Sequence, residues 1–143
     1  MNTPRNLADL LGRILMSVIF IVLGFQQVAD YAGTRAYMEL HGVLTAFLPL
    51  VIGLEVVGAV AIAAGYKTRA FAFLLASFTV LTALLFHREL GDPDQAASFM
   101  KNLAMAGGFL VMLAHGAGDW SLDAYTARFQ EPGGQPSRSS SAA

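Results

Sequence analysis

The chain has 143 residues, of which 55% are hydrophobic and only 13% are charged, whereas about a quarter of the residues in an ordinary soluble domain are charged. Nine basic and ten acidic residues leave a net charge of −1, which excludes the basic surface of a nucleic-acid-binding protein. The absence of cysteine excludes disulfides, thiol redox relays, iron–sulfur ligation and cysteine-based zinc sites.

Four apolar segments follow one another along the chain, and each is apolar on nearly all helical faces rather than along one stripe. They cover residues 10–29, 46–65, 70–86 and 99–116. A helix of about 20 residues spans a hydrocarbon core of about 30 Å, because each residue adds about 1.5 Å. The sequence therefore predicts an all-α, polytopic membrane protein with a bundle of four transmembrane helices in residues 1–129. A soluble four-helix protein is the alternative.

The segments outside the spans differ in character. The first span lacks an A-x-A cleavage site and ends in Gln26 and Gln27, so it is expected to be an uncleaved transmembrane helix rather than a signal peptide. Residues 30–42 contain interfacial aromatic residues and predict a short amphipathic helix lying on the membrane. Residues 87–98 form an acidic turn, and residues 130–143 are expected to be a disordered cytoplasmic tail.

Basic residues are distributed unequally between the two sides of the predicted bundle. Four spans place both termini on one side, which receives Arg5, Arg13, Lys67, Arg69, Arg128 and Arg138. The other side receives Arg35, Arg88 and Lys101. Because short cytoplasmic segments are enriched in lysine and arginine, both termini are predicted to lie in the cytoplasm.

Glu55 is the strongest indication of a functional site, because it lies in the middle of the second apolar segment. A charge at the centre of a membrane helix costs about 2.5–3.5 kcal/mol on insertion scales. Glu55 is therefore interpreted either as a neutral acid that donates a hydrogen bond inside the bundle or as a residue that handles protons or contacts a ligand. By helix rise, Arg13 and Lys101 each lie about 10 Å from Glu55 along the membrane normal. Each of these two basic residues is expected either to pair with Glu55 or to extend its side chain to the lipid headgroups.

Small residues at helical spacing predict close contacts between the spans. On the second span, Gly58, Ala59 and Ala63 follow Glu55 along one face. On the fourth span, Ala104 and Gly108 share a face. The sequence thus predicts a bundle whose polar residues point inward.

A second group of polar residues is expected at the end of the bundle opposite the termini. Gln27 closes the first span, His87 closes the third, and Lys101 and Asn102 begin the fourth. Antiparallel spans bring these residues to one membrane level, where they could bind a polar headgroup, a quinone carbonyl or an anion. Interfacial capping is the alternative. No metal site is predicted, because the three histidines lack ligand spacing.

The order and spacing of several stretches resemble the DoxX family of small bacterial inner-membrane proteins, close to its YqjF/YphA-type branch. These stretches are LGRILMSVIFIVLGFQQ, LVIGLEVVGAVAIAAGYKTR, FTVLTALLFH, FMKNLAMAGGFLVML and GAGDWSLD. The resemblance implies a four-helix membrane bundle. It points to Arg13, Gly24, Glu55, Gly65, Thr68, Arg69, Asn102 and residues 121–123. Relatives often carry a lysine where this chain has Gln27, so a charge pair or anion site that uses this lysine is in doubt here.

The expected function is that of a membrane anchor or quinone-interacting subunit of a redox-related system, not of a stand-alone enzyme. This expectation rests on similarity to the family, in which some members are associated with redox enzymes. Glu55 would handle a proton, and His87, Lys101 and Asn102 would contact a polar ligand. The expected partners are the lipid bilayer, a redox protein and further copies of the chain. A small proton-coupled transporter or permeation module centred on Glu55, and a purely structural or assembly factor, are the alternatives.

Overall fold

The predicted apolar segments form long helices in the computed structural model, which describes residues 3–130 and has no strand within that range. The elements are α1 (Thr3–Ala29), α2 (Tyr31–Leu40), the 3-10 turn η1 (Thr45–Phe47), α3 (Leu48–Ala64), α4 (Thr68–Phe86), α5 (Pro93–His115) and α6 (Leu122–Gln130). Four helices are long and apolar enough to cross a membrane, namely α1, η1 with α3, α4 and α5. The prediction of an all-α protein with four spans is confirmed.

Helices α1 and α5 begin before the apolar segments that predicted them, because polar residues extend both helices. At the start of α5, the Asp92 side chain accepts hydrogen bonds from the backbone amides of Asp94 (2.8 Å) and Gln95 (3.1 Å). Pro93 follows at the first helical position, where its missing N–H removes no helical hydrogen bond. At the other end of the chain, residue 130 of the predicted tail ends α6, and residues 131–143 lie outside the described part.

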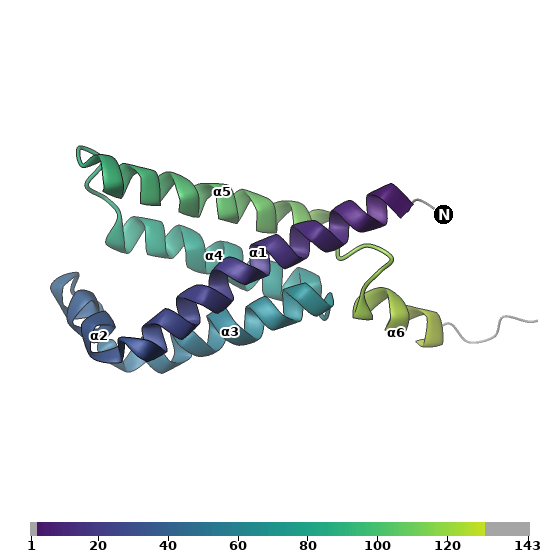
Figure 1. Ribbon diagram of the computed structural model, residues 1–143, viewed down its shortest axis with the longest axis horizontal. Coiled ribbons are helices and arrows are strands. Elements are labelled where there is room, and N and C mark those ends of the chain that lie inside the picture. Colours follow the sequence, from purple (N-terminus) through teal and green to yellow (C-terminus); the bar gives the residue numbers. More distant parts are fainter. Residues whose placement is uncertain (1–2, 131–143) are drawn as a thin grey trace, which may run out of the picture.

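The bundle consists of two helix pairs, α1 with α3 and α4 with α5, which are joined by contacts between α3 and α4 (Figure 1). One end carries α2 and the α4–α5 connection and is called the α2 end. The other carries the N-terminus, the α3–α4 turn and α6 and is called the α6 end. Between the two ends lies a core of buried apolar residues, comprising Phe20, Ala59, Ile62, Ala72, Leu75, Ala76 and Phe109.

Small residues allow the helices to approach one another in this core. A Cβ atom on Gly58 would come within 3.2 Å of Leu75 Cδ1, so the absence of a side chain there permits the contact between α3 and α4. Many large apolar side chains outside this core point outward, and Leu15 is 71% exposed. Apolar surface outside and small or polar residues inside is the arrangement expected in lipid, where aliphatic side chains gain little from mutual burial.

One predicted packing face is wrong. Ala104 is exposed, and the buried face of α5 carries Asn102, Ala106 and Phe109. These three residues recur at the four- and three-residue spacing of one helix face, which turns Ala104 away from the bundle. Gly108 lies beside this face, against Met16 of α1.

The predicted amphipathic helix in residues 30–42 is present as α2 and lies across the end of the bundle (Figure 1). Asp30 caps it by accepting a hydrogen bond from the Gly33 amide (3.1 Å). The ring of Tyr37 stacks on Phe86 at the end of α4, with 5.4 Å between ring centroids, and His41 lies against both rings. Aromatic contacts therefore hold α2 against the end of α4.

Candidate functional site

A cavity of about 720 Å³ lies at the α2 end, bordered by α1, α2, α3, α4 and α5. Its wall is mostly apolar, and Leu54, Phe78 and Met105 contribute to it from three different helices. The polar side chains on the wall include most of those that the sequence indicated. They are Gln27, Glu55, His87, Lys101 and Asn102. Five of the six predicted site residues thus surround one cavity, and Arg13 does not.

Glu55 and Gln27 form the polar centre of this cavity. Helix α1 approaches α3 closely at Gly24, where a Cβ atom would come within 2.6 Å of Val56 Cγ2. Gln27 lies almost one turn further along α1, so the same approach brings its side chain to Glu55. Gln27 Nε2 donates a hydrogen bond of 2.8 Å to Glu55 Oε2. Glu55 is only 3% exposed, so its carboxyl group points into the bundle and not into lipid.

The Glu55–Gln27 pair leaves hydrogen-bonding capacity unused. Gln27 Oε1 is buried and has no hydrogen-bond partner among the described residues. The ion pairs in residues 3–130 are Arg5–Asp9 and Arg35–Glu39, so no cation there lies within 4.0 Å of Glu55. The earlier possibility that Arg13 or Lys101 pairs with Glu55 is therefore not realised. A neutral carboxylic acid suits this environment, because its O–H group can donate while its other oxygen accepts from Gln27.

The side chains at the outer rim of the cavity are arranged differently. His87 ends α4, and its Nδ1 donates to Gln95 Oε1 (2.8 Å). In the neutral ring this leaves Nε2 as an acceptor. Asn102 is buried, and its Nδ2 donates to the Ser98 carbonyl (3.1 Å). Lys101 is exposed and forms no ion pair within the described part of the chain. The rim thus presents a cation, an amide and an imidazole to one cavity.

Sequence reasoning missed other polar contributors to the wall, namely Thr34, Tyr37, Thr82 and Ser98. Tyr37 was visible only as an interfacial aromatic residue. The Thr82 hydroxyl donates to the Phe78 carbonyl within α4 (2.9 Å). This contact is common in helices, so the sequence does not indicate that Thr82 lines a cavity. No group of three His, Asp or Glu side chains that could hold a metal occurs in residues 3–130.

Arg13 lies at the α6 end, where the chain folds back on itself. Arg13 is only 2% exposed, so the alternative that its side chain extends to the lipid headgroups is wrong. Arg13 Nη1 donates to the Ala63 carbonyl (3.2 Å), and Nη2 donates to the Trp120 carbonyl. The guanidinium group therefore joins α1 to the end of α3 and to the segment before α6.

Asp123 completes this connection. Its carboxylate accepts hydrogen bonds from the Lys67 amide (2.7 Å) and the Thr68 amide (2.9 Å), and so it caps α4. Its own amide donates to the Gly65 carbonyl (2.8 Å). Gly65 has a φ of +68°, and a Cβ atom there would collide with Arg13 Nη1 and Ser121 Cβ. Arg13, Gly65, Trp120 and Asp123 together are called the arginine clamp. It joins helix ends far apart in sequence and is separate from the cavity.

Comparison with known proteins gives consistent results. The family model DoxX matches residues 8–88. The inner membrane protein YqjF of Escherichia coli (strain K12) is 46% identical over 123 residues, which cover 86% of this chain and 95% of that protein. The inner membrane protein YphA of the same organism is 34% identical over 129 residues, covering 85% and 92% of the two chains. No solved structure gives a significant match. The chain is therefore an integral inner-membrane protein that belongs to the DoxX family.

Proposed function

We propose that this protein is a quinone-interacting membrane subunit of a redox-related system and that a quinone ring binds in the cavity beside Glu55. The observation that carries this proposal is the buried Glu55–Gln27 pair, which borders a mostly apolar cavity with Lys101 and Asn102 on its wall. The volume of about 720 Å³ falls within the range of about 300–1,000 Å³ that small-molecule sites occupy.

The chemistry of the wall suits a ring with two carbonyl oxygens and an apolar tail. A neutral Glu55 can donate a hydrogen bond to one carbonyl, and the Lys101 ammonium group can donate to another. The apolar side chains around them, including Leu54, Phe78 and Met105, suit the ring faces and the start of the tail. Cavity sites of this kind combine a hydrophobic lining with a few polar groups that orient the ligand.

Within this proposal, Glu55 exchanges one of the two protons that accompany the two-electron reduction or oxidation of the quinone, and Gln27 holds the carboxyl group in place. The chain has no cysteine, so a thiol or an iron–sulfur cluster of its own cannot supply electrons. Electrons would come from a redox protein bound at the membrane surface, for which this chain acts as anchor.

The proposal includes an orientation with both termini in the cytoplasm. Lys67, Arg69 and Arg13 all belong to the α6 end, which carries the termini, and such residues favour the cytoplasmic side. The cavity then lies toward the periplasmic leaflet. Reporter fusions at residue 130 and within the α4–α5 connection test this orientation. Reporter activity typical of a periplasmic C-terminus would contradict this orientation.

Quinone binding is tested by native mass spectrometry of the protein purified in nanodiscs, followed by titration with a short-tailed quinone. Wild type should retain quinone, and excess ligand should stabilise it against thermal unfolding, by about 2.7 kcal/mol at a hundredfold excess over Kd. Glu55→Leu should lose this stabilisation. Glu39→Gln is the matched control, because it removes an exposed carboxylate on α2. Neither bound quinone nor a co-purifying redox partner in wild type would contradict the proposal.

Proton-coupled transport is the second candidate, and the burial of Glu55 beside a cavity favours it. The core between Phe20 and Phe109 argues against a permanently open pore, because apolar side chains fill the bundle beneath the cavity. A transporter would have to rearrange these helices. In proteoliposomes, a solute flux that Glu55→Gln abolishes would favour transport over quinone binding. If Glu55→Gln changed only stability, a structural or assembly role would be favoured.

A further inference from the structure

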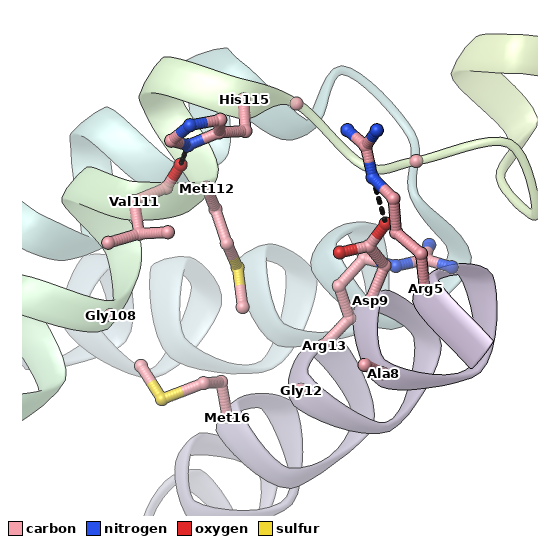
Figure 2. Close-up of a pocket in the computed structure, with 12 residues that line it drawn as sticks. Arg5, Ala8, Asp9, Gly12, Arg13, Met16, Gly108, Val111, Met112 and His115 are labelled. Atoms are coloured by element: carbon pink, nitrogen blue, oxygen red, sulfur yellow. Dashed lines mark hydrogen bonds and ion pairs between the residues drawn. The ribbon is translucent and has the colours of Figure 1, made fainter. Parts of the chain in front are cut away.

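A second cavity, of about 500 Å³, lies at the α6 end between the first turns of α1 and the last turns of α5 (Figure 2). It is separate from the quinone cavity, because the apolar core lies between the two. Helices α1 and α5 meet where Phe20 contacts Phe109 (5.4 Å between ring centroids) and where Met16 lies against Gly108. Nearer the α6 end the two helices are further apart, and the space between them is the cavity.

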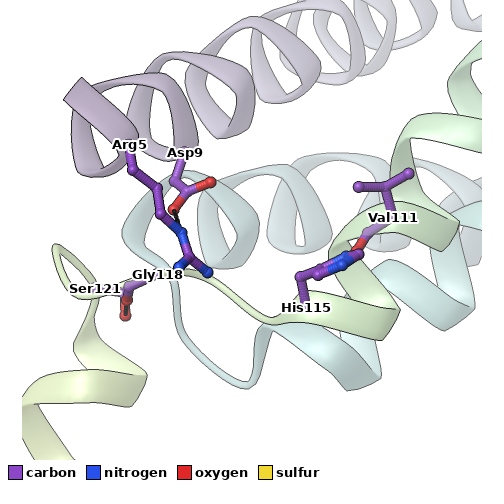
Figure 3. Close-up of polar contacts among 6 residues, drawn as sticks. All are labelled: Arg5, Asp9, Val111, His115, Gly118 and Ser121. Carbon is purple, nitrogen blue, oxygen red and sulfur yellow. Dashed lines mark hydrogen bonds and ion pairs between the residues drawn. The ribbon is translucent and has the colours of Figure 1, made fainter. Parts of the chain in front are cut away.

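The mouth of this cavity carries an excess of positive charge. Arg5 contributes an exposed guanidinium group at the mouth, and the buried Arg13 of the arginine clamp adds a second positive charge on the wall. Asp9 contributes the one carboxylate among the described lining residues. Arg5 Nε lies 4.0 Å from Asp9 Oδ2, and both side chains face the chain at Gly118 (Figure 3). Arg69 lies beside Gly116, where a Cβ atom would be 3.7 Å from its Nε. The mouth therefore favours an anion.

His115 forms the opposite rim. Its Nδ1 donates to the Val111 carbonyl within α5 (3.0 Å), so the ring is held on the α5 side of the cavity (Figure 3). In the neutral ring Nε2 is then an acceptor, which suits a hydroxyl group of a ligand rather than a phosphate oxygen.

The floor of the cavity is apolar and is lined by glycine and by unbranched methionine side chains. The Met16 and Met112 side chains extend into it from α1 and α5 (Figure 2). Gly12 lines the wall, and a Cβ atom there would meet nothing within 4 Å. Flexible methionine side chains adapt to irregular apolar ligands. From Arg5 to Met16 the cavity follows α1 for roughly 16 Å by helix rise, from the end of the span into the hydrocarbon region.

We propose that this cavity is a specific site for an anionic phospholipid. The phosphodiester lies at Arg5, the headgroup hydroxyls lie near Asp9 and His115, and one acyl chain follows Gly12, Met16 and Met112 along the seam between α1 and α5. A basic pocket between transmembrane helices, with an apolar continuation into the bilayer, is the chemistry that recognises such headgroups. Two guanidinium groups against one carboxylate favour an anionic over a zwitterionic lipid. The site does not depend on quinone binding at the other end.

Lipid retention measured by native mass spectrometry tests the charge part of this proposal. The protein is released from nanodiscs that contain equal amounts of phosphatidylglycerol, phosphatidylethanolamine and phosphatidylcholine. Wild type should retain phosphatidylglycerol preferentially. Arg5→Gln should reduce this retention about fivefold, which is the equilibrium equivalent of one basic side chain at an anionic surface. Arg35→Gln is the matched control, because Arg35 is an exposed residue with the same i,i+4 ion pair, to Glu39 at 4.0 Å, at the other end.

Filling the cavity tests its apolar part. Gly12→Leu places a side chain in open space within a helix, so it should exclude the acyl chain while the protein still folds. Gly53→Leu is the control, because a Cβ atom on Gly53 of α3 also meets nothing within 4 Å. Loss of bound lipid in Gly12→Leu and not in Gly53→Leu supports the proposal. Equal retention of all three lipids by wild type, or unchanged retention in both Arg5→Gln and Gly12→Leu, would overturn it.

A soluble headgroup separates lipid binding from phosphate binding. Glycerophosphate, added in excess, should not displace the bound phosphatidylglycerol, because it lacks the acyl chain that occupies the floor. Complete displacement would show that the site recognises phosphate alone and would overturn the assignment to a lipid.

Discussion

The two ends of the bundle each bury one ionisable side chain, and they treat it in opposite ways. At the α6 end, two carbonyl groups from distant segments accept hydrogen bonds from Arg13, which also lines the smaller of the two cavities. At the α2 end, Glu55 has one amide partner and borders the larger cavity. The hydrogen bonds of Arg13 join three segments that are distant in sequence, whereas Glu55 is held by a single side-chain amide. We therefore expect Arg13 to act mainly in stability and Glu55 mainly in the proposed ligand binding.

The largest loss of stability is expected from Arg13→Met. This change leaves the Ala63 and Trp120 carbonyls without their donor, and a hydrogen bond to a charged group contributes about 1.5–3 kcal/mol. The free energy of unfolding should fall by about 3 kcal/mol. Denaturation in mixed micelles, followed by circular dichroism, measures it. Arg13→Lys should lose an intermediate amount of stability, because an ammonium group cannot reproduce the planar, forked arrangement of the guanidinium N–H donors. Wild-type stability in Arg13→Met would mean that the clamp is not structural.

Gly65→Ala should cause the second largest loss of stability. The added methyl group would collide with Arg13 and Ser121, and a non-glycine residue at φ +68° adds a backbone cost of about 1–2 kcal/mol. A total loss of about 2 kcal/mol is expected in the same assay. Gly53→Ala is the control, and it should raise stability by about 0.5–1 kcal/mol because its Cβ atom meets open space within a helix. Equal effects of the two changes would contradict the close packing of the clamp.

Asp123→Ala should cost about 1 kcal/mol, the usual loss when a helix cap is removed. Asp92→Ala removes a comparable cap from α5 and should cost a similar amount. Only Asp123→Ala should also change the fluorescence of Trp120, the single tryptophan, because Asp123 holds the segment that carries it. A fluorescence change in both variants would show that Trp120 responds to global loosening instead.

The smallest effect on stability is expected from Glu55→Gln. An amide preserves the shape of the side chain and can still accept a hydrogen bond from Gln27, so stability should change by less than about 1 kcal/mol. Proton exchange should nevertheless be lost, because an amide does not titrate. If Glu55 were a buried charge, its neutral replacement would stabilise the protein by several kcal/mol. Such a gain would remove the distinction between the two ends.

The sequence predicted those features that depend on local composition. The four spans and α2 follow from apolar runs and interfacial aromatic residues. The membrane level shared by Gln27, His87 and Lys101 follows from antiparallel helices of similar length. The bond between Gln27 and Glu55 could not be predicted, because it depends on how closely α1 approaches α3 at Gly24.

The role of Arg13 was hidden for another reason. Its acceptors are backbone carbonyls 50 and 107 residues away, and a carbonyl group leaves no mark in the sequence. The resemblance did point to Gly65 and to residues 121–123, which now prove to belong to the same clamp. The face assigned to Ala104 was wrong, because small size alone does not fix which side of a helix meets its neighbours.

The apolar core between the two cavities has a consequence for energy coupling. It lies between Glu55 and the α6 end, so the cavity at the α2 end is the side from which a proton could reach Glu55. Any proton that Glu55 exchanges would then come from, or return to, one compartment. In the orientation proposed above, with both termini in the cytoplasm, that compartment would be the periplasm. Quinone chemistry at this site would therefore be vectorial, and it would respond to external rather than internal acidity.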